Sequence, residues 1–484
     1  MHRDSLSLLT DFYQLTMAYA YWKNGLSERR ASFHLFFRRP PFKGGFTIAC
    51  GLEAVKNFIE EFRFNQSDLV YLSSLKNPLG HQIFESGFLE MLAKLRLTVN
   101  IDAVVEGRVV FPYEPLLRVE GPMLQCQILE SPLLNLINFP TLIATKAARI
   151  CLAAQGDPVM EFGLRRAQGI DGALTASRAA FVGGCSSTSN VLAGKEFGIP
   201  VQGTHAHSWI MAFEDEEEAF RAYAKVLPET SLFLVDTYNT IEGVKKAIRV
   251  GKWLKSQGKQ MLGIRLDSGD LAYLSIESRK LLDEAGFFDA KIVASNELDE
   301  IVISELKRQG AKISVWGVGT NLVTGKDQPA LDGVYKLSAL QDAEGVWQYT
   351  LKLSEQLAKV SNPGRLQVKR FMHDGYYVAD IVYDIALGIS KPQHNVDPFD
   401  PSKVVYIDDA YSSQDLLEPI FVDGKLVYEF PKLKEVQEVT KRELQHLPVG
   451  MKRFLNPHTY PVGMEKGLYD LKMKLTKKIR RRVQ

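Results

Sequence analysis

Between residues 158 and 320, short β-rich runs alternate with longer helical stretches. Seven such runs occur, separated by roughly 20 to 30 residues, which is about the length that a strand, a helix and two turns require. The spacing predicts an α/β fold in which parallel strands and helices wind into an irregular barrel resembling the (β/α)8 fold. The predicted strands are PVMEFG (158–163), AAFVGG (179–184), IPVQGT (199–204), SLFLVDT (231–237), MLGIRLD (261–267), KIVASN (291–296) and KISVWGVGT (312–320).

The chain has 484 residues, about three times a typical domain, so we expect two or three modules. Residues 1–130 form the first. They begin with a helix, for which Asp11 is a candidate cap, and continue with strand-like runs at 31–39 and 46–52 that we expect to pair. Short runs broken by Gly and Pro in 100–130 are typical of an antiparallel sheet.

The remaining modules follow from changes in pattern along the chain. Residues 131–335 are expected to form the barrel that carries the active site. Strand-like runs return in 336–430, and we expect them to complete the sheet of the first module, giving an open-faced α/β domain built from both ends of the chain. Residues 431–484 are predicted to be a helical, basic segment. Its last 14 residues carry seven basic and no acidic side chains, which favours a solvated terminal helix over a nucleic-acid or membrane contact.

The composition excludes several classes of protein. Lys and Arg number 59 and Asp and Glu 57, so the net charge is +2, and small-molecule substrates are more plausible partners than nucleic acid or an anionic membrane. No stretch of about 18 consecutive apolar residues and no secretory leader pattern is present. The four cysteines are far apart in sequence, with no CxxC pair, which favours reduced thiols over a disulfide or a zinc site. We therefore expect a cytoplasmic protein.

Polar and charged side chains follow most of the predicted barrel strands. In a (β/α) barrel the chemistry lies at the carboxyl ends of the strands, so we expect these side chains to surround one pocket. They are Gly163, Arg165, Arg166, Gly203, Thr204, His205, His207, Asp236, Thr237, Arg265, Asp267, Ser268, Gly269, Asp270, Ser295, Asn296, Gly317, Gly319 and Thr320.

Two subsets of these residues are suited to binding an anion. The GVGT run (317–320) offers glycines that let backbone N–H groups approach a phosphate, and a threonine hydroxyl, although such strand ends are common. Arg165, Arg166 and Arg265 are planar donors that can grip a carboxylate or a phosphate. Salt bridges to neighbouring carboxylates are the structural alternative for each of these arginines.

The acidic residues and histidines have similar alternatives. Asp236, Asp267 and Asp270 could hold sugar hydroxyls or a Mg²⁺ ion that bridges phosphate oxygens, but an aspartate after a strand can equally cap a helix. His205 and His207 could each be a hydrogen-bonded structural histidine, a general base or a nucleophile toward a phosphoryl group. A metal site at the HxH pair lacks a nearby third His or Cys.

The order of these motifs resembles the nicotinate phosphoribosyltransferase family, a type II phosphoribosyltransferase group, over nearly the whole chain. The motifs are TDFYQLTMAYAYW (10–22), EFGLRRAQGIDGALTASRAA (161–180), SSTSNVLAG (186–194), GTHAHSW (203–209), DTYNT (236–240), GIRLDSGDL (263–271), ASNELDE (294–300), WGVGTNLVT (316–324) and LNPHTYPVG (455–463).

The resemblance implies a reaction in which nicotinate and 5-phosphoribosyl 1-pyrophosphate give nicotinate mononucleotide and pyrophosphate, as a step of NAD salvage. It implies ATP as a cosubstrate, hydrolysed through a phosphorylated histidine that by its place in the motif is His207, and Mg²⁺ as a cofactor. It also implies a homodimer with shared active sites, in which Tyr13 of the partner subunit borders the nicotinate ring.

The remaining site residues are carried over in the same way. Arg165, Thr204 and Arg265 are expected to line the nicotinate pocket, while Gly319 and Thr320 are expected to hold the phosphate of phosphoribosyl pyrophosphate. Nicotinate is a carboxylate on a flat ring, and an arginine with an aromatic neighbour complements it.

The chemistry adds expectations for catalysis. A C–O bond at the anomeric carbon breaks and charge grows on pyrophosphate, so a basic pocket containing Mg²⁺ would stabilise the transition state. We expect His207, Arg265 and Asp267 to be catalytic, and Asp236 and Asp270 to contact ribose or Mg²⁺. The metal ligands themselves are not identified by the sequence.

Three alternatives stay open. A nicotinamide phosphoribosyltransferase would need a group that prefers a neutral amide, and GTHAHSW (203–209) supplies no acidic one. A quinolinate phosphoribosyltransferase would release carbon dioxide without ATP and is usually a much shorter chain. A catalytically silent binding protein with the same fold is disfavoured because the Arg, Asp, His and Thr candidates all occur together.

Overall fold

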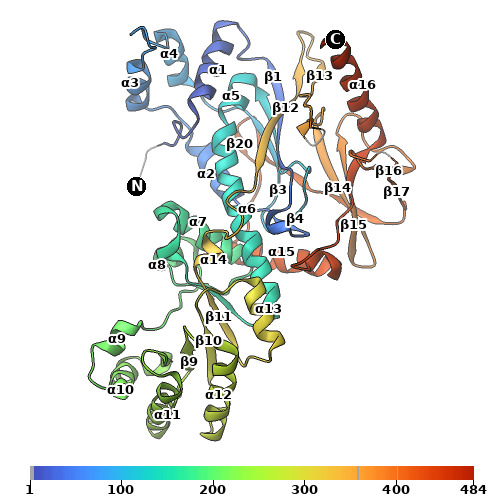
Figure 1. The fold of residues 1–484 in the computed structure, drawn as a ribbon. Helices are drawn as coiled ribbons and strands as arrows, with labels where there is room; N and C mark the ends of the chain where they lie inside the picture. Colours follow the sequence, from blue (N-terminus) through green and yellow to red (C-terminus); the bar gives the residue numbers. More distant parts are fainter. Residues whose placement is uncertain (1–4, 357–358, 401, 484) are drawn as a thin grey trace. The chain divides into compact units, whose positions relative to one another are not determined.

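The computed structural model describes residues 5–356, 359–400 and 402–483, which divide into two compact units (Figure 1). The first unit contains the described residues up to Leu142 and those from Ala330 onward, and the second is Ile143–Pro329. The first boundary falls inside one long helix, α6 (Glu130–Ala153). The chain therefore leaves the first unit, builds the second, and returns to complete the first.

The main sheet of the first unit is antiparallel and has the strand order β13-β12-β1-β5-β3-β19-β20. Its strands are β1 (Arg30–Phe37), β3 (Asn100–Val104), β5 (Leu117–Pro122), β12 (Gly333–Gln341), β13 (Trp347–Tyr349), β19 (Leu417–Val422) and β20 (Lys425–Leu426). In β1, residues 31–37 are all buried, so both faces of this aromatic-rich strand are covered. The expected antiparallel sheet in 100–130 is present as β3 and β5.

The expected pairing of 31–39 with 46–52 is wrong. β1 pairs with β12 and β5, whereas β2 (Thr47–Ile48) pairs with β4 (Val109–Val110). Local strand propensity identifies β1 but does not specify a partner that lies about 300 residues away in sequence.

Residues 336–430 complete the first sheet only in part, which corrects the expectation for this segment. Besides β12, β13, β19 and β20, the C-terminal part forms a second sheet in the order β17-β16-β21-β15-β14-β18. Its strands are β14 (Leu366–His373), β15 (Tyr376–Asp384), β16 (Gln393–Val396), β17 (Val404–Ile407), β18 (Ser412–Asp415) and β21 (Val462–Glu465).

A buried arginine ties the second sheet to its surroundings. Arg370, on β14, has a fully buried side chain and pairs with Asp380 of β15 at 2.6 Å and with Glu443 at 3.3 Å. Tyr460, from the LNPHTYPVG segment, donates to Asp380 and stacks on Phe111. The C-terminal motif is thus part of a packed polar core in this unit.

Helices cover the sheets of the first unit. An aromatic cluster joins α1 to α4, with Tyr19 and Trp22 packed on Phe84 and Phe88. The helices are α1 (Phe12–Lys23), α2 (Leu52–Glu61), α3 (Gln66–Ser74), α4 (Ser86–Lys94), α5 (Met123–Ile128), α15 (Leu433–His446) and α16 (Lys466–Val483). The last two lie in the segment 431–484, which also supplies strand β21 to the second sheet.

The second unit is built on a parallel sheet in the order β7-β6-β11-β10-β9-β8. Its strands are β6 (Val159–Glu161), β7 (Ser187–Thr188), β8 (Leu232–Leu234), β9 (Gly263–Leu266), β10 (Lys291–Ala294) and β11 (Val315–Val318). The helices are α7 (Gly169–Val182), α8 (Val191–Phe197), α9 (His207–Met211), α10 (Glu216–Val226), α11 (Thr240–Ser256), α12 (Leu271–Glu284), α13 (Glu300–Arg308) and α14 (Thr320–Val323).

Two of the seven predicted barrel strands are wrong. AAFVGG (179–184) is the end of helix α7, whose buried alanines recur at helical spacing, and the strand follows it at β7. IPVQGT (199–204) contributes only an isolated parallel bridge from Val201 to Thr188. The other five runs each contain a strand.

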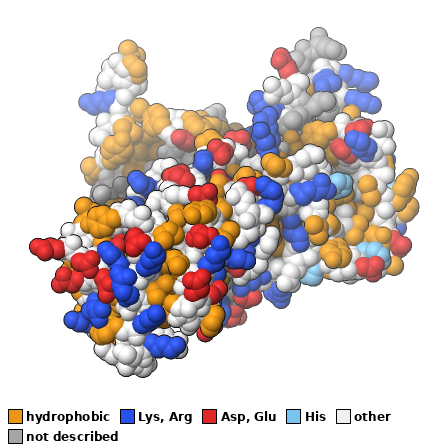
Figure 2. Space-filling model, turned by 60° about the horizontal axis from the view of Figure 1, so that its bottom comes forward, with side chains coloured by type: hydrophobic (Ala, Val, Ile, Leu, Met, Phe, Trp, Pro, Cys, Tyr) orange, Lys and Arg blue, Asp and Glu red, His pale blue; other side chains and the backbone are white. Residues whose placement is uncertain are grey.

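Within the described residues, one helix, α6, is by length and composition apolar enough to cross a membrane, but 72% of its most apolar stretch is buried inside the protein, which is typical of a core helix. On the face drawn in Figure 2, Lys and Arg side chains are interspersed with Asp and Glu over much of the surface. This mixed surface agrees with the nearly balanced charge of the sequence.

Candidate active site

The turn after β6 is fixed by a buried glutamate. Glu161, the last residue of β6, is only 1% exposed, and its carboxylate accepts hydrogen bonds from the Gly163 backbone N–H, from Ser177 at 2.8 Å and from Thr188 at 2.6 Å. It thereby joins β6 to α7 and β7. The short 3-10 helix Leu164–Arg166 that follows presents two exposed arginines.

Arg265, on β9, is the hub of the site. Its guanidinium donates to Ser295 Oγ at 2.8 Å, to Thr204 Oγ1 at 3.0 Å and to Asp267 Oδ1 at 2.9 Å, and it lies 5.8 Å from the centre of the Phe162 ring. These bonds use three of its five N–H donors, which leaves two for a ligand. They also fix the orientation of the planar group before any ligand arrives.

The carboxylate of Asp267 is held in its charged form. Burial by itself would raise the pKa of Asp267, but hydrogen bonds from Ser295 and Arg265, together with the positive charge of Arg265, outweigh burial and lower this pKa below its usual value. Asp267 and Arg265 therefore stay paired as ions in neutral solution.

His207 begins α9 and lies between two carboxylates. Its Nδ1 is 3.1 Å from Thr237 Oγ1, and its Nε2 is 3.9 Å from Asp236 Oδ1 and 3.8 Å from Asp267 Oδ2. The side chain is 40% exposed, so Nε2 is accessible. The Thr237 contact fixes the ring, because it leaves only the Nε2 edge facing the carboxylates.

One carboxylate oxygen of Asp236 accepts hydrogen bonds within the protein, and the other accepts none. Its Oδ2 accepts hydrogen bonds from the Asp267 backbone N–H at 2.9 Å and from Ser268 Oγ at 2.6 Å. Its Oδ1, which faces His207, is buried and has no hydrogen-bond partner. A buried carboxylate oxygen without a partner is costly and suits a cation or a donor that arrives with a ligand.

His205 is a structural residue of the sheet. Its Nε2 accepts a hydrogen bond from the backbone N–H of Leu234 in β8 at 3.2 Å. β8 is an outer strand of the sheet, and in a closed barrel a further strand would pair with it. Burial, with smaller contributions from the charges of Arg265 and His207, lowers the pKa of His205 to about 4. It is therefore neutral at pH 7, as its acceptor role requires.

The GVGT run ends β11 and begins α14. Gly317 lies against Phe162, where an added Cβ would approach the ring to 2.8 Å, so the absence of a side chain is needed for packing. Gly319 similarly lies against the backbone of Phe162, and Thr320 is the first residue of α14. The close approach lets Phe162 pack beneath the site.

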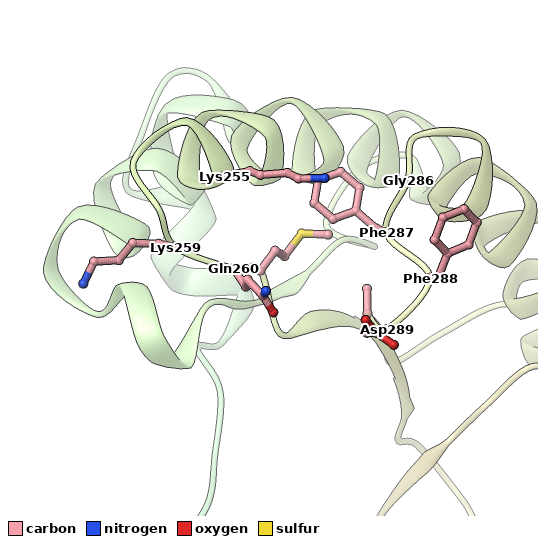
Figure 3. A pocket seen from close by; sticks show the side chains of 9 residues that line it. Lys255, Lys259, Gln260, Gly286, Phe287, Phe288 and Asp289 are labelled. Atoms are coloured by element: carbon pink, nitrogen blue, oxygen red, sulfur yellow. The ribbon is translucent and has the colours of Figure 1, made fainter.

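These strand ends enclose a cavity of about 200 Å³. It is lined by Phe162, Arg165, Arg166, Arg265, Asp267, Ser295, Asn296, Glu297, Gly317, Gly319 and Thr320. Three arginines line it with only two carboxylates, one of which is already paired to Arg265, so the cavity suits an anionic ligand. Another cavity, of about 160 Å³, lies at the amino ends of β9 and β10 between Lys255 and Phe288 and lacks such a set of groups (Figure 3).

Models of the nicotinate phosphoribosyltransferase N-terminal domain, family and C-terminal domain match residues 8–138, 158–351 and 365–472, respectively. The chain belongs to the nicotinate phosphoribosyltransferase family.

Relatives of this family match nearly the full length. A nicotinate phosphoribosyltransferase of Bacillus subtilis (strain 168) is 44% identical over 488 aligned positions, which cover 99% of this chain and 97% of the relative. The crystal structure of human nicotinic acid phosphoribosyltransferase matches with a TM-score of 0.83 and 31% identity, covering 96% of this chain and 99% of that chain. A nicotinate-nucleotide pyrophosphorylase from Pyrococcus furiosus shares the fold, with a TM-score of 0.68 and 24% identity over 92% of this chain and 97% of that chain. The predicted α/β fold class is confirmed.

Most of the site residues expected from the nicotinate phosphoribosyltransferase motifs lie together in the second unit. Two differ. Tyr13 belongs to the first unit, where it lies on α1 with 49% of its surface exposed. Asp270 caps α12 by accepting a hydrogen bond from the Tyr273 backbone N–H. It does not line the cavity, and neither do Thr204, His207 and Asp236, although these three lie beside Arg265 or Asp267. The structure thus shows the capping role of Asp270, and its contact with ribose or Mg²⁺ stays a prediction.

Three residues in or beside the lining of this cavity were not singled out from the sequence. Glu161, Phe162 and Glu297 all fall inside quoted motifs, EFG and ASNELDE, next to residues that were singled out. Their place at the ends of β6 and β10 is the signal that could have identified them.

Proposed function

We propose that the protein is a nicotinate phosphoribosyltransferase that joins nicotinate to 5-phosphoribosyl 1-pyrophosphate, giving nicotinate mononucleotide and pyrophosphate as a step of NAD biosynthesis. The observation that carries the proposal is the preorganised Arg265, with two donors left for an anion, in a cavity lined by two further arginines. Family membership over nearly the full length supports the same activity.

Nicotinate requires a site for one carboxylate on a flat ring. The free donors of Arg265 suit the carboxylate, with Thr204 fixing the guanidinium from one side and Arg165 adding charge from the turn after β6. Binding a carboxylate in place of a neutral amide distinguishes this activity from that of a nicotinamide phosphoribosyltransferase. The same preference disfavours that alternative.

Phosphoribosyl pyrophosphate requires donors at its phosphates. Gly319 and Thr320, at the start of α14, lie beside Arg165 and Arg166 in the lining of the cavity and are suited to the 5-phosphate. As the C–O bond at the anomeric carbon breaks, negative charge grows on pyrophosphate. Fixed arginine side chains stabilise that charge more than the ground state because they need not reorganise.

ATP hydrolysis is assigned to His207. The exposed Nε2 attacks the γ-phosphorus of ATP, the bond between that phosphorus and the bridging oxygen breaks, and ADP leaves with the electron pair. In this step the Nδ1–H of His207 donates a hydrogen bond to Thr237 Oγ1. The proton therefore stays on Nδ1, and Nε2 carries the lone pair that attacks. Hydrolysis of the N–P bond then returns phosphate and free His207.

Mg²⁺ is the cofactor proposed for this step. The described residues contain no cluster of three or more His, Cys, Asp or Glu that could hold a metal alone, but Mg²⁺ commonly takes one or two carboxylates and completes its shell with substrate phosphates. Asp236, whose Oδ1 is without a partner, and Asp267 fit that role. The ion would supply positive charge between these carboxylates and a phosphoryl group.

The assembly and location follow the family resemblance. We infer a cytoplasmic homodimer in which Tyr13 of one subunit borders the nicotinate bound in the other, with small-molecule substrates and no nucleic-acid or membrane partner. The exposure of Tyr13 is compatible with such a contact.

The test is base-dependent pyrophosphate release with and without ATP. Purified protein is given phosphoribosyl pyrophosphate with nicotinate, nicotinamide or quinolinate. Release with nicotinate alone, stimulated by ATP, supports the proposal, whereas release only with another base, or none with any base, contradicts it. With γ-labelled ATP, acid-labile label on the wild type that is absent from His207→Ala supports the phosphohistidine, and equal label on both contradicts it.

A further inference from the structure

Two consecutive residues after β10 adopt left-handed backbone conformations. Asn296 has φ +86° and Glu297 has φ +41°. Such angles cost free energy for a residue with a Cβ, less for Asn than for Glu. Glu297 is exposed, and its carboxylate makes no hydrogen bond or ion pair within the described part of the chain, so its side chain does not compensate for this conformation. Strained residues of this kind tend to persist where function uses them.

A buried asparagine holds this turn. Asn321, on α14, is 2% exposed, and its side-chain amide donates to the carbonyl oxygen of Glu297 at 3.0 Å and to that of Leu298 at 3.1 Å. Both N–H groups of the amide are therefore committed to the strained turn. Asn321 directly follows Thr320, so this clamp fixes the turn after β10 against the turn after β11, and residues of both turns line the cavity.

Glu297 is the carboxylate of the cavity that is still available. Asp267 is already bound to Arg265 and Ser295. The three arginines of the lining attract a phosphate, whereas a free carboxylate repels it. A carboxylate in this lining therefore suits a ligand that also has groups which donate hydrogen bonds. A phosphorylated sugar has both kinds of group, since its phosphates suit the arginines and its hydroxyls suit a carboxylate.

We propose that Glu297 contacts the substrate by accepting hydrogen bonds from the ribose hydroxyls of phosphoribosyl pyrophosphate, and that Asn321 is the positioning residue that holds it there. The inference rests on the proposed function, because that function supplies the ribose. The strained turn places Glu297 in the lining of the cavity.

Glu297→Gly tests the contact, because it removes the carboxylate and the strain together. We expect a melting temperature at or about 2 °C above that of the wild type, with phosphoribosyl pyrophosphate bound at least roughly tenfold more weakly in calorimetry and nicotinate bound within about twofold. A residue with only a structural role would not combine higher stability with weaker binding of one substrate.

Gln155→Gly is the matched control. Gln155 is an exposed residue of the same unit with φ +52°, and it does not line the cavity. This variant should be stabilised in the same way, with binding of phosphoribosyl pyrophosphate unchanged.

A comparison of ribose 5-phosphate with 2-deoxyribose 5-phosphate tests the hydroxyl contact directly. The wild type should bind the ribose compound several-fold more tightly, and Glu297→Gly should lose most of that preference while retaining the phosphate contribution common to both.

Asn321→Ala tests the positioning. It should lower the melting temperature and weaken phosphoribosyl pyrophosphate more than nicotinate, and its cost in melting temperature should shrink when it is combined with Glu297→Gly, because no strained turn then needs to be held.

The outcomes separate the two proposals. A wild-type protein that binds neither phosphoribosyl pyrophosphate nor ribose 5-phosphate overturns the proposed function and this inference with it. A wild-type protein that binds them, with Glu297→Gly binding them equally well, overturns the inference alone. Loss of stability and of both substrates in Glu297→Gly also overturns it, because Glu297 would then be structural.

Discussion

At the scale of single residues, Arg265 is the group on which nicotinate binding should depend most. Arg265→Ala removes the guanidinium and leaves Asp267, Thr204 and Ser295 without their shared donor. We expect the KM for nicotinate to rise roughly 100-fold, since charge-assisted hydrogen bonds to a carboxylate are lost. The KM for phosphoribosyl pyrophosphate should change far less. Steady-state kinetics with each substrate varied in turn measures both, and an equal rise in the two constants would contradict the assigned role.

His205 predicts a pH dependence of stability. Its folded pKa of about 4 lies below the usual value near 6.5, so between these pH values the unfolded chain binds more protons and stability falls as pH falls. The loss from this group is about 3 kcal/mol between pH 6.5 and 4. His205→Gln keeps an acceptor for Leu234 but does not titrate, so urea unfolding at a series of pH values should give it a shallower acid loss. Parallel curves for the two proteins would refute this.

The sequence predicted most of the residues that gather at the site, and the physical reason is simple. Parallel strands align their carboxyl ends, so polar residues just after buried runs, such as Arg265, must meet. What each one does was not predictable. Whether Asp270 caps a helix, or His205 accepts a backbone hydrogen bond, depends on atoms brought close by folding. Glu297 follows the β10 run within a quoted motif and could have been identified there, but the left-handed backbone that places it could not.

At the scale of elements, strands with short, mostly apolar runs, such as β9 and β10, were predictable because most of their residues are buried. β7 was not, since Ser187–Thr188 is a polar pair whose strand state comes from its pairing with β6 and from the bridge to Val201. The run at 179–184 was misassigned because a short apolar stretch with alanines fits a buried helix end as well as a strand. Pairings between distant segments, such as β1 with β12, arise from topology that local propensity does not encode.

Glu161 is the residue that joins several elements of the second unit, and its length should matter more than its charge. Glu161→Asp cannot reach Gly163, Ser177 and Thr188 together, so we expect a loss of about 2 kcal/mol in the free energy of unfolding and a higher KM for nicotinate. Glu161→Gln keeps the reach and should be milder in both respects.

Urea unfolding and kinetics measure these effects of the Glu161 variants. The exposed Glu229, changed to Asp in the same unit, controls for the shortening itself. If Glu161→Asp behaves like Glu229→Asp, the buried carboxylate does not set the turn that carries Arg165.

At the scale of the whole molecule, the proposed shared active site makes a prediction that no single subunit can satisfy. Tyr13 and His207 lie in different units of the chain, and the proposal assigns them to one site contributed by two subunits. Tyr13→Ala and His207→Ala should each be nearly inactive. When the two variants are unfolded together and refolded as a mixture, half of the dimers should be mixed, and each mixed dimer should contain one site with both residues intact.

The refolded mixture should therefore recover about a quarter of the wild-type activity, measured as nicotinate-dependent pyrophosphate release. Each variant refolded alone controls for recovery that does not depend on mixing. If each subunit instead completed its own site, every site in the mixture would still lack one of the two residues, and no activity would return. The measured fraction thus distinguishes a site built within one chain from a site built between two.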